Sequence, residues 1–136
     1  MTARRTDTQS IEVDADPADV LGLLAAARRL PEWASAFADT VEPADGAGRW
    51  TASKSGQESP LRVLVDEGSR TVDYLPGNDG DIGGHTRVLP RPGGGSVVLF
   101  TQPLPPDADA ARATVTAELH ALRALLDHQP PEPAVP

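Results

Sequence analysis

The sequence contains no cysteine, few aromatic side chains and no long hydrophobic run, and each of these features excludes a class of protein. Without cysteine the chain cannot form disulfides, thiolate metal sites or a cysteine nucleophile. None of its apolar runs approaches the ~18 residues of a membrane-spanning helix. Acidic residues outnumber basic ones by 20 to 12, and the formal net charge is −8. We therefore expect neither nucleic acid nor an anionic membrane surface as a partner, because both are bound through basic surfaces.

The remaining composition fits one globular domain of 136 residues. The two arginines near the N-terminus are not followed by an apolar run, so no signal peptide is predicted and a cytoplasmic location is expected. We predict a flexible N-terminus at residues 1–8, a folded domain at 9–127 and a proline-rich tail at 128–136, because such a tail has little to bury.

The first part of the domain predicts one strand and two short helices. Residues 11–15, IEVDA, alternate between apolar and acidic side chains, as is typical of a half-buried strand. Asp16 is expected to cap the next helix, and Pro17 suits its first turn. Pro31 ends this helix and begins a second one, PEWASAF.

The middle of the chain changes to a period of two, which predicts strands joined by hairpins. Turns are expected at Asp45-Gly46, at residues 67–69 and at the glycine-rich segment 92–95. Together with the first strand, these segments make about seven short antiparallel strands. The acidic loop at 76–84 lacks the spacing and the terminal glutamate of a calcium loop, so no metal site is predicted.

The last part of the domain predicts one long helix. Asp107 is placed to cap it, and its apolar residues recur at helical spacing along a single face: Val115, Leu119, Leu122 and Leu126. A helix with one apolar stripe must pack against something, and the sheet is the only large partner. A twisted sheet of this size curls, and a helix on its concave side leaves part of the hollow unfilled. The expected fold class is α+β, with an internal cavity.

Three segments resemble the START-like, Bet v 1-like superfamily, also called SRPBCC or polyketide cyclase/dehydrase. IEVDADPADVLGLL is similar to its opening strand and helix, LPEWASAFADTVE to its second helix and following strand, and GGGSVVLFTQPLPPDADAARATVTAELHALRALLD to its last strand and closing helix. The resemblance spans roughly residues 9–127. The segments VLVDEGSRTVDYLPG and GGHTRVLPRPGGGSVVLFTQPLPPDA resemble small uncharacterised bacterial members.

The resemblance implies a helix-grip fold: a curved antiparallel sheet, two short helices and one long C-terminal helix around a cavity for a hydrophobic or amphipathic molecule. Members of the superfamily include lipid carriers, plant hormone receptors, polyketide aromatase/cyclases and activators of chaperone ATPases. The fold alone does not choose among these functions.

Several side chains are candidates for the wall of such a cavity. Trp33 and Phe37 lie in the short helix that would close one end, where they either touch a ligand or simply pack as core. Trp50 lines the cavity or covers the outer sheet surface. We include Leu119 and Leu122, from the apolar stripe of the long helix, among the ligand-binding candidates.

The candidates for chemistry are His85 and Arg87, with Tyr74 as a polar pocket residue. His85 and Arg87 are two residues apart, so their side chains share one strand face. If that face points inward, they would act on a carboxylate or enolate, with His85 as an acid or base. If it points outward, they belong to the solvated surface. Asp73 and Tyr74 face opposite sides. If Asp73 faces inward, it needs a partner such as Arg62 or Arg87; alternatively such a pair lies on the outer face as a cross-strand ion pair, which is the arrangement we expect.

The leading hypothesis is a carrier or sensor that encloses a small hydrophobic molecule without a cofactor. The first alternative is a cyclase, aromatase or dehydratase that acts in the same cavity, although no catalytic motif is present. The second is a protein-interaction module such as a chaperone co-factor. A homodimer is compatible with the sequence, and stable membrane insertion is not expected.

Overall fold

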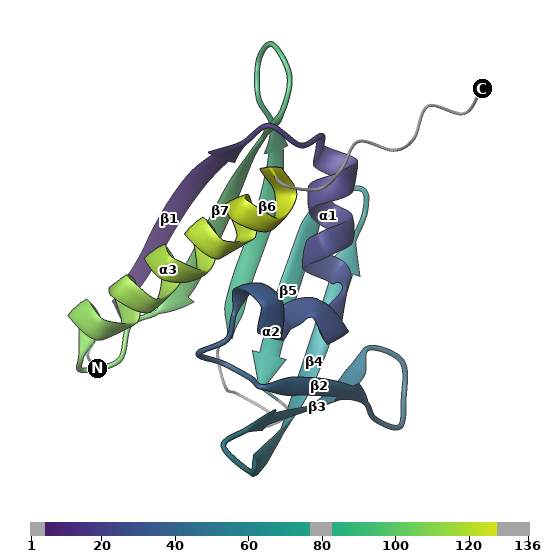
Figure 1. Cartoon of the computed structure of the whole chain (residues 1–136), viewed down its shortest axis with the longest axis vertical. Coiled ribbons are helices and arrows are strands. Elements are labelled where there is room, and N and C mark those ends of the chain that lie inside the picture. Colours follow the sequence, from purple (N-terminus) through teal and green to yellow (C-terminus); the bar gives the residue numbers. More distant parts are fainter. Residues whose placement is uncertain (1–4, 77–82, 128–136) are drawn as a thin grey trace.

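The computed structural model describes residues 5–76 and 83–127. Seven antiparallel strands form one sheet in the order β1-β7-β6-β5-β4-β3-β2 (Figure 1). Their bounds are β1 (Thr6–Val13), β2 (Thr40–Pro43), β3 (Arg49–Lys54), β4 (Gln57–Asp66), β5 (Thr71–Pro76), β6 (Gly84–Pro90) and β7 (Ser96–Pro103). Each strand from β2 to β7 pairs with its neighbour in sequence, and β1 closes the order by pairing with β7.

The helices are α1 (Pro17–Ala25), the 3-10 turn η1 (Ala27–Arg29), α2 (Leu30–Trp33) and α3 (Ala108–Asp127). The long helix therefore follows the last strand, and the short helices lie between β1 and β2. The prediction of an α+β helix-grip fold, with about seven strands and one long C-terminal helix, is confirmed.

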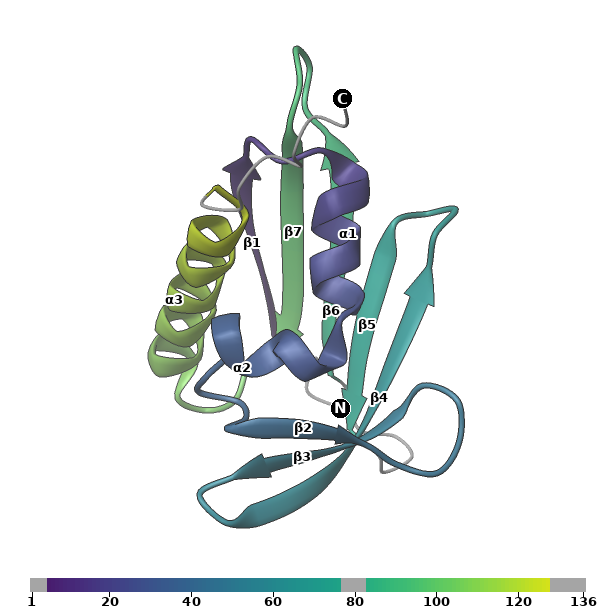
Figure 2. The ribbon, with the colours of Figure 1, turned by 45° about the vertical axis from the view of Figure 1, so that its right-hand side comes forward.

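The sheet is strongly curved, and the bend lies along β4, whose two ends pair with different strands. The first part of β4, from Gln57 to Arg62, pairs with β3, whereas the part from Leu61 to Asp66 pairs with β5. As a result β2 and β3 run across the lower end of the molecule, whereas β7 runs along its length (Figure 2). The concave side produced by this bend faces the helices.

Helices α1 and α3 cover different parts of the concave face. α1 packs against β5 and β6, while α3 packs mainly against β1 and α2. The expected apolar stripe of α3 is buried: Val115, Leu119, Leu122 and Leu126 all belong to the hydrophobic core. The backbone N–H of Ala110 donates to the Asp107 carboxylate (3.3 Å), as expected for the cap.

Three local features differ from the sequence-based expectation. β1 begins at Thr6, inside the segment expected to be flexible, because β7 extends to Pro103 and pairs with it. α2 ends at Trp33 rather than at residue 37, since Ala34 leaves the helical conformation. Asp16 precedes α1 with extended backbone angles, but its side chain makes no capping bond. The expected tail at 128–136 and most of the acidic loop lie outside the described residues.

Candidate functional site

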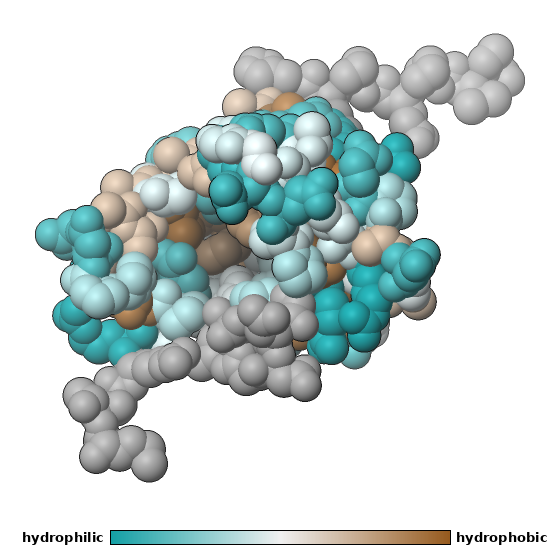
Figure 3. All heavy atoms as spheres, turned by 90° about the horizontal axis from the view of Figure 1, so that it is seen from below, coloured by the Kyte–Doolittle hydropathy of each residue, from teal (hydrophilic) through white to brown (hydrophobic). Residues whose placement is uncertain are grey.

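A pocket of about 400 Å³ lies at the lower end of the concave face, between the sheet, α2 and the N-terminal half of α3. Figure 3 shows the hollow from below, with hydrophobic residues at its base. Its larger apolar side chains are Leu30, Trp33, Phe37, Leu61, Tyr74 and Phe100. Four of these six carry aromatic rings, although the whole chain is only 4% aromatic. The aromatic side chains are thus concentrated at one site.

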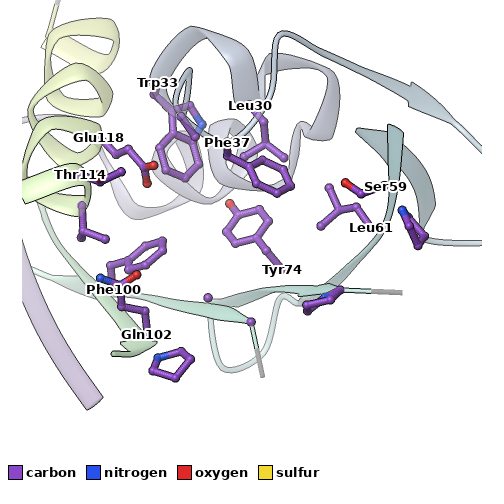
Figure 4. A pocket seen from close by; sticks show the side chains of 17 residues that line it. Leu30, Trp33, Phe37, Ser59, Leu61, Tyr74, Phe100, Gln102, Thr114 and Glu118 are labelled. Carbon is purple, nitrogen blue, oxygen red and sulfur yellow. The ribbon is translucent and has the colours of Figure 1, made fainter. Parts of the chain in front are cut away.

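Trp33 and Tyr74 form the centre of the pocket wall (Figure 4). Their ring centroids are 6.0 Å apart and the planes meet at 63°, an edge-to-face geometry that aromatic pairs favour. Trp33 is 3% exposed, whereas Phe37 is 42% exposed at the mouth. The Trp33 indole nitrogen has no hydrogen-bond partner within the described part of the chain.

Tyr74 links the sheet to α1 through a short hydrogen bond. Its hydroxyl donates to the Leu24 carbonyl oxygen (2.6 Å). Burial raises the pKa of Tyr74, so the phenol stays neutral throughout the physiological range. The hydroxyl is therefore already used by the fold, and Tyr74 contributes its aromatic ring to the pocket lining.

Glu118 supplies the one carboxyl group among the described lining residues. It projects from α3 toward the middle of the pocket in Figure 4, and burial raises its pKa to about 7. Within residues 5–76 and 83–127 it forms no ion pair. Glu118 can therefore take either protonation state near neutral pH and can donate or accept a hydrogen bond accordingly.

The other polar lining groups are mostly committed to the backbone. Gln102 donates from Nε2 to the Ala111 carbonyl (3.1 Å), and Thr114 donates from Oγ1 to the Ala110 carbonyl (3.0 Å). Ser59 lies at the edge of the pocket on β4 (Figure 4). Among the described lining residues, Glu118 is thus the ionisable side chain that the fold leaves without a hydrogen bond or an ion pair.

Two glycines allow the sheet to pass close beneath the pocket. A Cβ at Gly84 would lie 2.8 Å from the Phe100 ring, and a Cβ at Gly83 would meet the Tyr74 carbonyl oxygen. Neither position tolerates a side chain without a shift of its neighbours. Gly84 begins β6, and the two glycines leave room there for the Phe100 ring and the backbone of Tyr74.

His85 and Arg87 lie on the opposite, convex face of the sheet. The alternate residues of β6, Thr86 and Val88, are buried on the concave side. The His85 Nδ1 atom is 2.8 Å from a carboxylate oxygen of Asp73 on β5, and Arg87 is exposed. His85 and Arg87 therefore do not form an inward-facing acid–base pair. Asp73 does face outward, as expected, but its partner is His85 rather than an arginine.

The remaining candidates occupy different places. Trp33, Phe37 and Tyr74 line the pocket together. Leu119 and Leu122 are buried in the core, and Trp50 packs against that core; none of the three lines the pocket.

Sequence reasoning missed Glu118 and Phe100. Glu118 lies three residues after Val115 and four before Leu122, so helical spacing places it beside the apolar stripe. Phe100 alternates with Ser96 and Val98, which are both buried. The helical spacing that places Glu118 and the strand alternation that places Phe100 can both be seen in the sequence.

The described residues 5–76 and 83–127 contain no helix long and apolar enough to cross a membrane. In the same part of the chain, no three acidic or histidine side chains come together in a way that would hold a metal ion.

No protein-family model and no curated protein matches the sequence. Solved structures do match its fold over almost the whole chain. An uncharacterised protein from Bacillus thuringiensis has a TM-score of 0.72 at 16% identity, covering 90% of this chain and 98% of its own. A START superfamily protein from Mycobacterium smegmatis has a TM-score of 0.68 at 12% identity, covering 89% and 96%. The Zhui aromatase/cyclase from Streptomyces sp. R1128 has a TM-score of 0.66 at 17% identity, covering 91% and 94%.

Proposed function

The chain has the START-like fold, and from this premise we propose that it binds a small hydrophobic or amphipathic molecule in the pocket between the sheet, α2 and α3. In this function the protein is a carrier or sensor. The observation that carries the proposal is the concentration of four aromatic rings around about 400 Å³ of space.

The size and chemistry of the pocket support this function. Small-molecule sites usually enclose roughly 300–1,000 Å³, with apolar walls and a few polar groups that set orientation. The pocket has this composition, with Glu118 as its single carboxyl group among the described residues. Aromatic and aliphatic walls release ordered water when an apolar molecule enters, and this release favours binding.

A cyclase or aromatase is the second candidate, and one observation favours it. Burial brings the pKa of Glu118 to about 7, which is the range that suits a general acid or base. Against it, His85 and Arg87 face away, and the Tyr74 hydroxyl is bonded to the Leu24 carbonyl. One proton-transfer group in an apolar pocket fits binding better than a multistep cyclisation.

A probe of neutral charge tests the binding function. Nile red fluoresces strongly only in apolar surroundings, and we expect its emission to rise saturably on titration with the protein. Ser59→Trp places a large ring at the edge of the pocket and should weaken binding at least tenfold. Glu58→Trp is the matched control, because it adds the same ring one residue earlier, where strand alternation turns the side chain to the other face.

The outcome distinguishes the pocket from the general surface. If Ser59→Trp and Glu58→Trp bind Nile red equally well, the dye is not held in the pocket and the proposal fails. Mass spectrometry of small molecules extracted from the purified protein adds the chemical identity of an occupant. Chemical conversion of an added polyketide-like substrate, lost in Glu118→Gln, would favour the enzyme over the carrier.

A further inference from the structure

Glu118 places a carboxyl group in a pocket whose other described lining residues carry no charge. Its side chain points from α3 toward the pocket in Figure 4, and Trp33 and Phe100 line the same pocket. No arginine, lysine or histidine is among the described lining residues. A half-buried carboxylate without a cation is costly, and folded proteins usually pair such groups or use them.

Within residues 5–76 and 83–127, the elements around Glu118 offer it no cationic partner. Tyr74 on β5 is the other titratable group of the described lining, and it is neutral. Glu32 on α2 is paired with the neighbouring arginine (2.8 Å). Arg112, which precedes Glu118 on α3, lies 3.5 Å from Asp7 of β1. The lining residues from β4 and β7 are uncharged.

We propose that the preferred ligand is a small amphipathic amine, whose apolar body lies among the aromatic rings and whose ammonium group pairs with the Glu118 carboxylate. This inference rests on the proposed binding function and specifies the ligand class. An ammonium–carboxylate pair is a strong, charge-assisted hydrogen bond. Trp33 and Phe100 line the same pocket, and aromatic rings attract a cation that lies over their faces.

The same arrangement disfavours anionic amphiphiles such as fatty acids. A ligand carboxylate at this position would meet Glu118 with no described lining cation between them. The net charge of −8 acts in the same direction at longer range. Selection between head groups of opposite sign is therefore the expected property of the pocket.

Binding of an amine should strengthen as the pH rises. Burial raises the pKa of Glu118 to about 7, so the carboxyl is mostly protonated at about pH 5.5 and mostly ionised at about pH 8. An alkylamine stays protonated over this range. If only the ionised form binds the amine well, the apparent affinity should rise about 30-fold between these two pH values.

Three probes that share a naphthyl group test the head-group preference: naphthylethylamine as the cation, naphthylethanol as the neutral compound, and the carboxylate of naphthylacetic acid as the anion. Isothermal titration calorimetry at about pH 5.5 and about pH 8 measures each affinity. At the higher pH the wild type should bind the amine at least tenfold more tightly than the alcohol, and the acetate most weakly. The alcohol should bind similarly at both pH values.

Glu118→Gln keeps the shape of the side chain and removes its charge. We expect this variant to lose the amine preference and its pH dependence while it still binds the alcohol. Glu12→Gln is the control. Glu12 is exposed on β1 between two inward-facing residues, so its own side chain points away from the concave face. The variant changes the net charge by the same amount as Glu118→Gln but leaves the pocket lining intact. Glu12→Gln should behave as the wild type.

The outcomes separate this inference from the function on which it rests. Equal binding of amine and alcohol by the wild type at about pH 8, or an amine preference that survives in Glu118→Gln, overturns the inference and leaves the binding function standing. Failure of Nile red to show pocket-dependent binding overturns the function itself. If Glu118→Gln does not fold by circular dichroism, the wild-type pH profile decides: an amine affinity that does not rise with pH contradicts the inference.

Discussion

The two halves of the concave sheet face differ in what covers them. In the upper half, valines on the strands meet leucines from α1 and α3, and the fully buried side chains include Val72, Val88, Val98, Leu24 and Leu122. In the lower half the sheet carries Leu61, Tyr74 and Phe100, and the pocket remains between them and the helices. One continuous sheet thus supports a core of buried valines and leucines in one half and the aromatic pocket in the other.

The difference follows from the length of the covering helices. α1 has nine residues and buries Val20, Leu23 and Leu24. α2 has only four residues, and its buried side chains are Leu30 and Trp33. A single helical turn supplies too few side chains to interdigitate with the strands beneath it, so large rings bridge the gap without filling it. The stability of the fold is therefore expected to come mainly from the upper half, and selectivity from the lower.

The largest effect is expected from Leu122→Ala in the packed half. Leu122 is 0% exposed, and truncation of such a side chain leaves a cavity that costs about 2–5 kcal/mol. Urea unfolding should show this loss, while Nile red binding by the folded variant should change little because Leu122 does not line the pocket. Leu61→Ala, in the hollow half, should cost less, since it enlarges space that already exists. Equal losses for the two variants would contradict the division into a packed and a hollow half.

A smaller effect is expected from Tyr74→Phe at the junction between the halves. The change removes the hydroxyl that donates to the Leu24 carbonyl (2.6 Å) and leaves that buried oxygen without its partner. We expect a loss of about 1–2 kcal/mol in the free energy of unfolding, measured in urea. The ring and its edge-to-face contact with Trp33 remain, so Nile red should still bind. Unchanged stability would show that the hydrogen bond does not tie α1 to the sheet.

The fold was largely predictable from sequence because its elements rest on local patterns. The spacing of Val115, Leu119 and Leu122 predicts one buried helix face, and helical geometry leaves no other arrangement. The glycines at 93–95 all have positive φ values, which residues with a side chain rarely adopt. The run of glycines therefore predicts the hairpin turn at this place. Such signals need no knowledge of distant parts of the chain.

The site was predicted only in part, because it depends on which strand face turns inward. Trp33 was found from its place after Leu30-Pro31, and it does line the pocket. The parity of β6 shows that His85 and Arg87 share a face but not which one. In the structure the other face of β6, with Thr86 and Val88, is the buried one, so His85 and Arg87 point outward. Because Val88 is apolar, the sequence already indicated which face of the strand would be buried. Glu118 was missed because a charged residue beside an apolar stripe resembles an ordinary solvated position.

The smallest effect is expected from His85→Ala on the convex face. The His85 side chain is 42% exposed, and its contact with Asp73 (2.8 Å) is a surface pair of a kind that contributes about 0–1 kcal/mol. Urea unfolding should therefore shift only slightly, and the affinity for Nile red and for naphthylethylamine should stay within about twofold of the wild type, because the residue is separated from the pocket by the sheet. Arg87→Ala, two residues along the same face, is the matched control and should behave alike. A clear loss of probe binding in His85→Ala but not in Arg87→Ala would mean that the convex face influences the pocket, and the separation of the two faces would have to be abandoned.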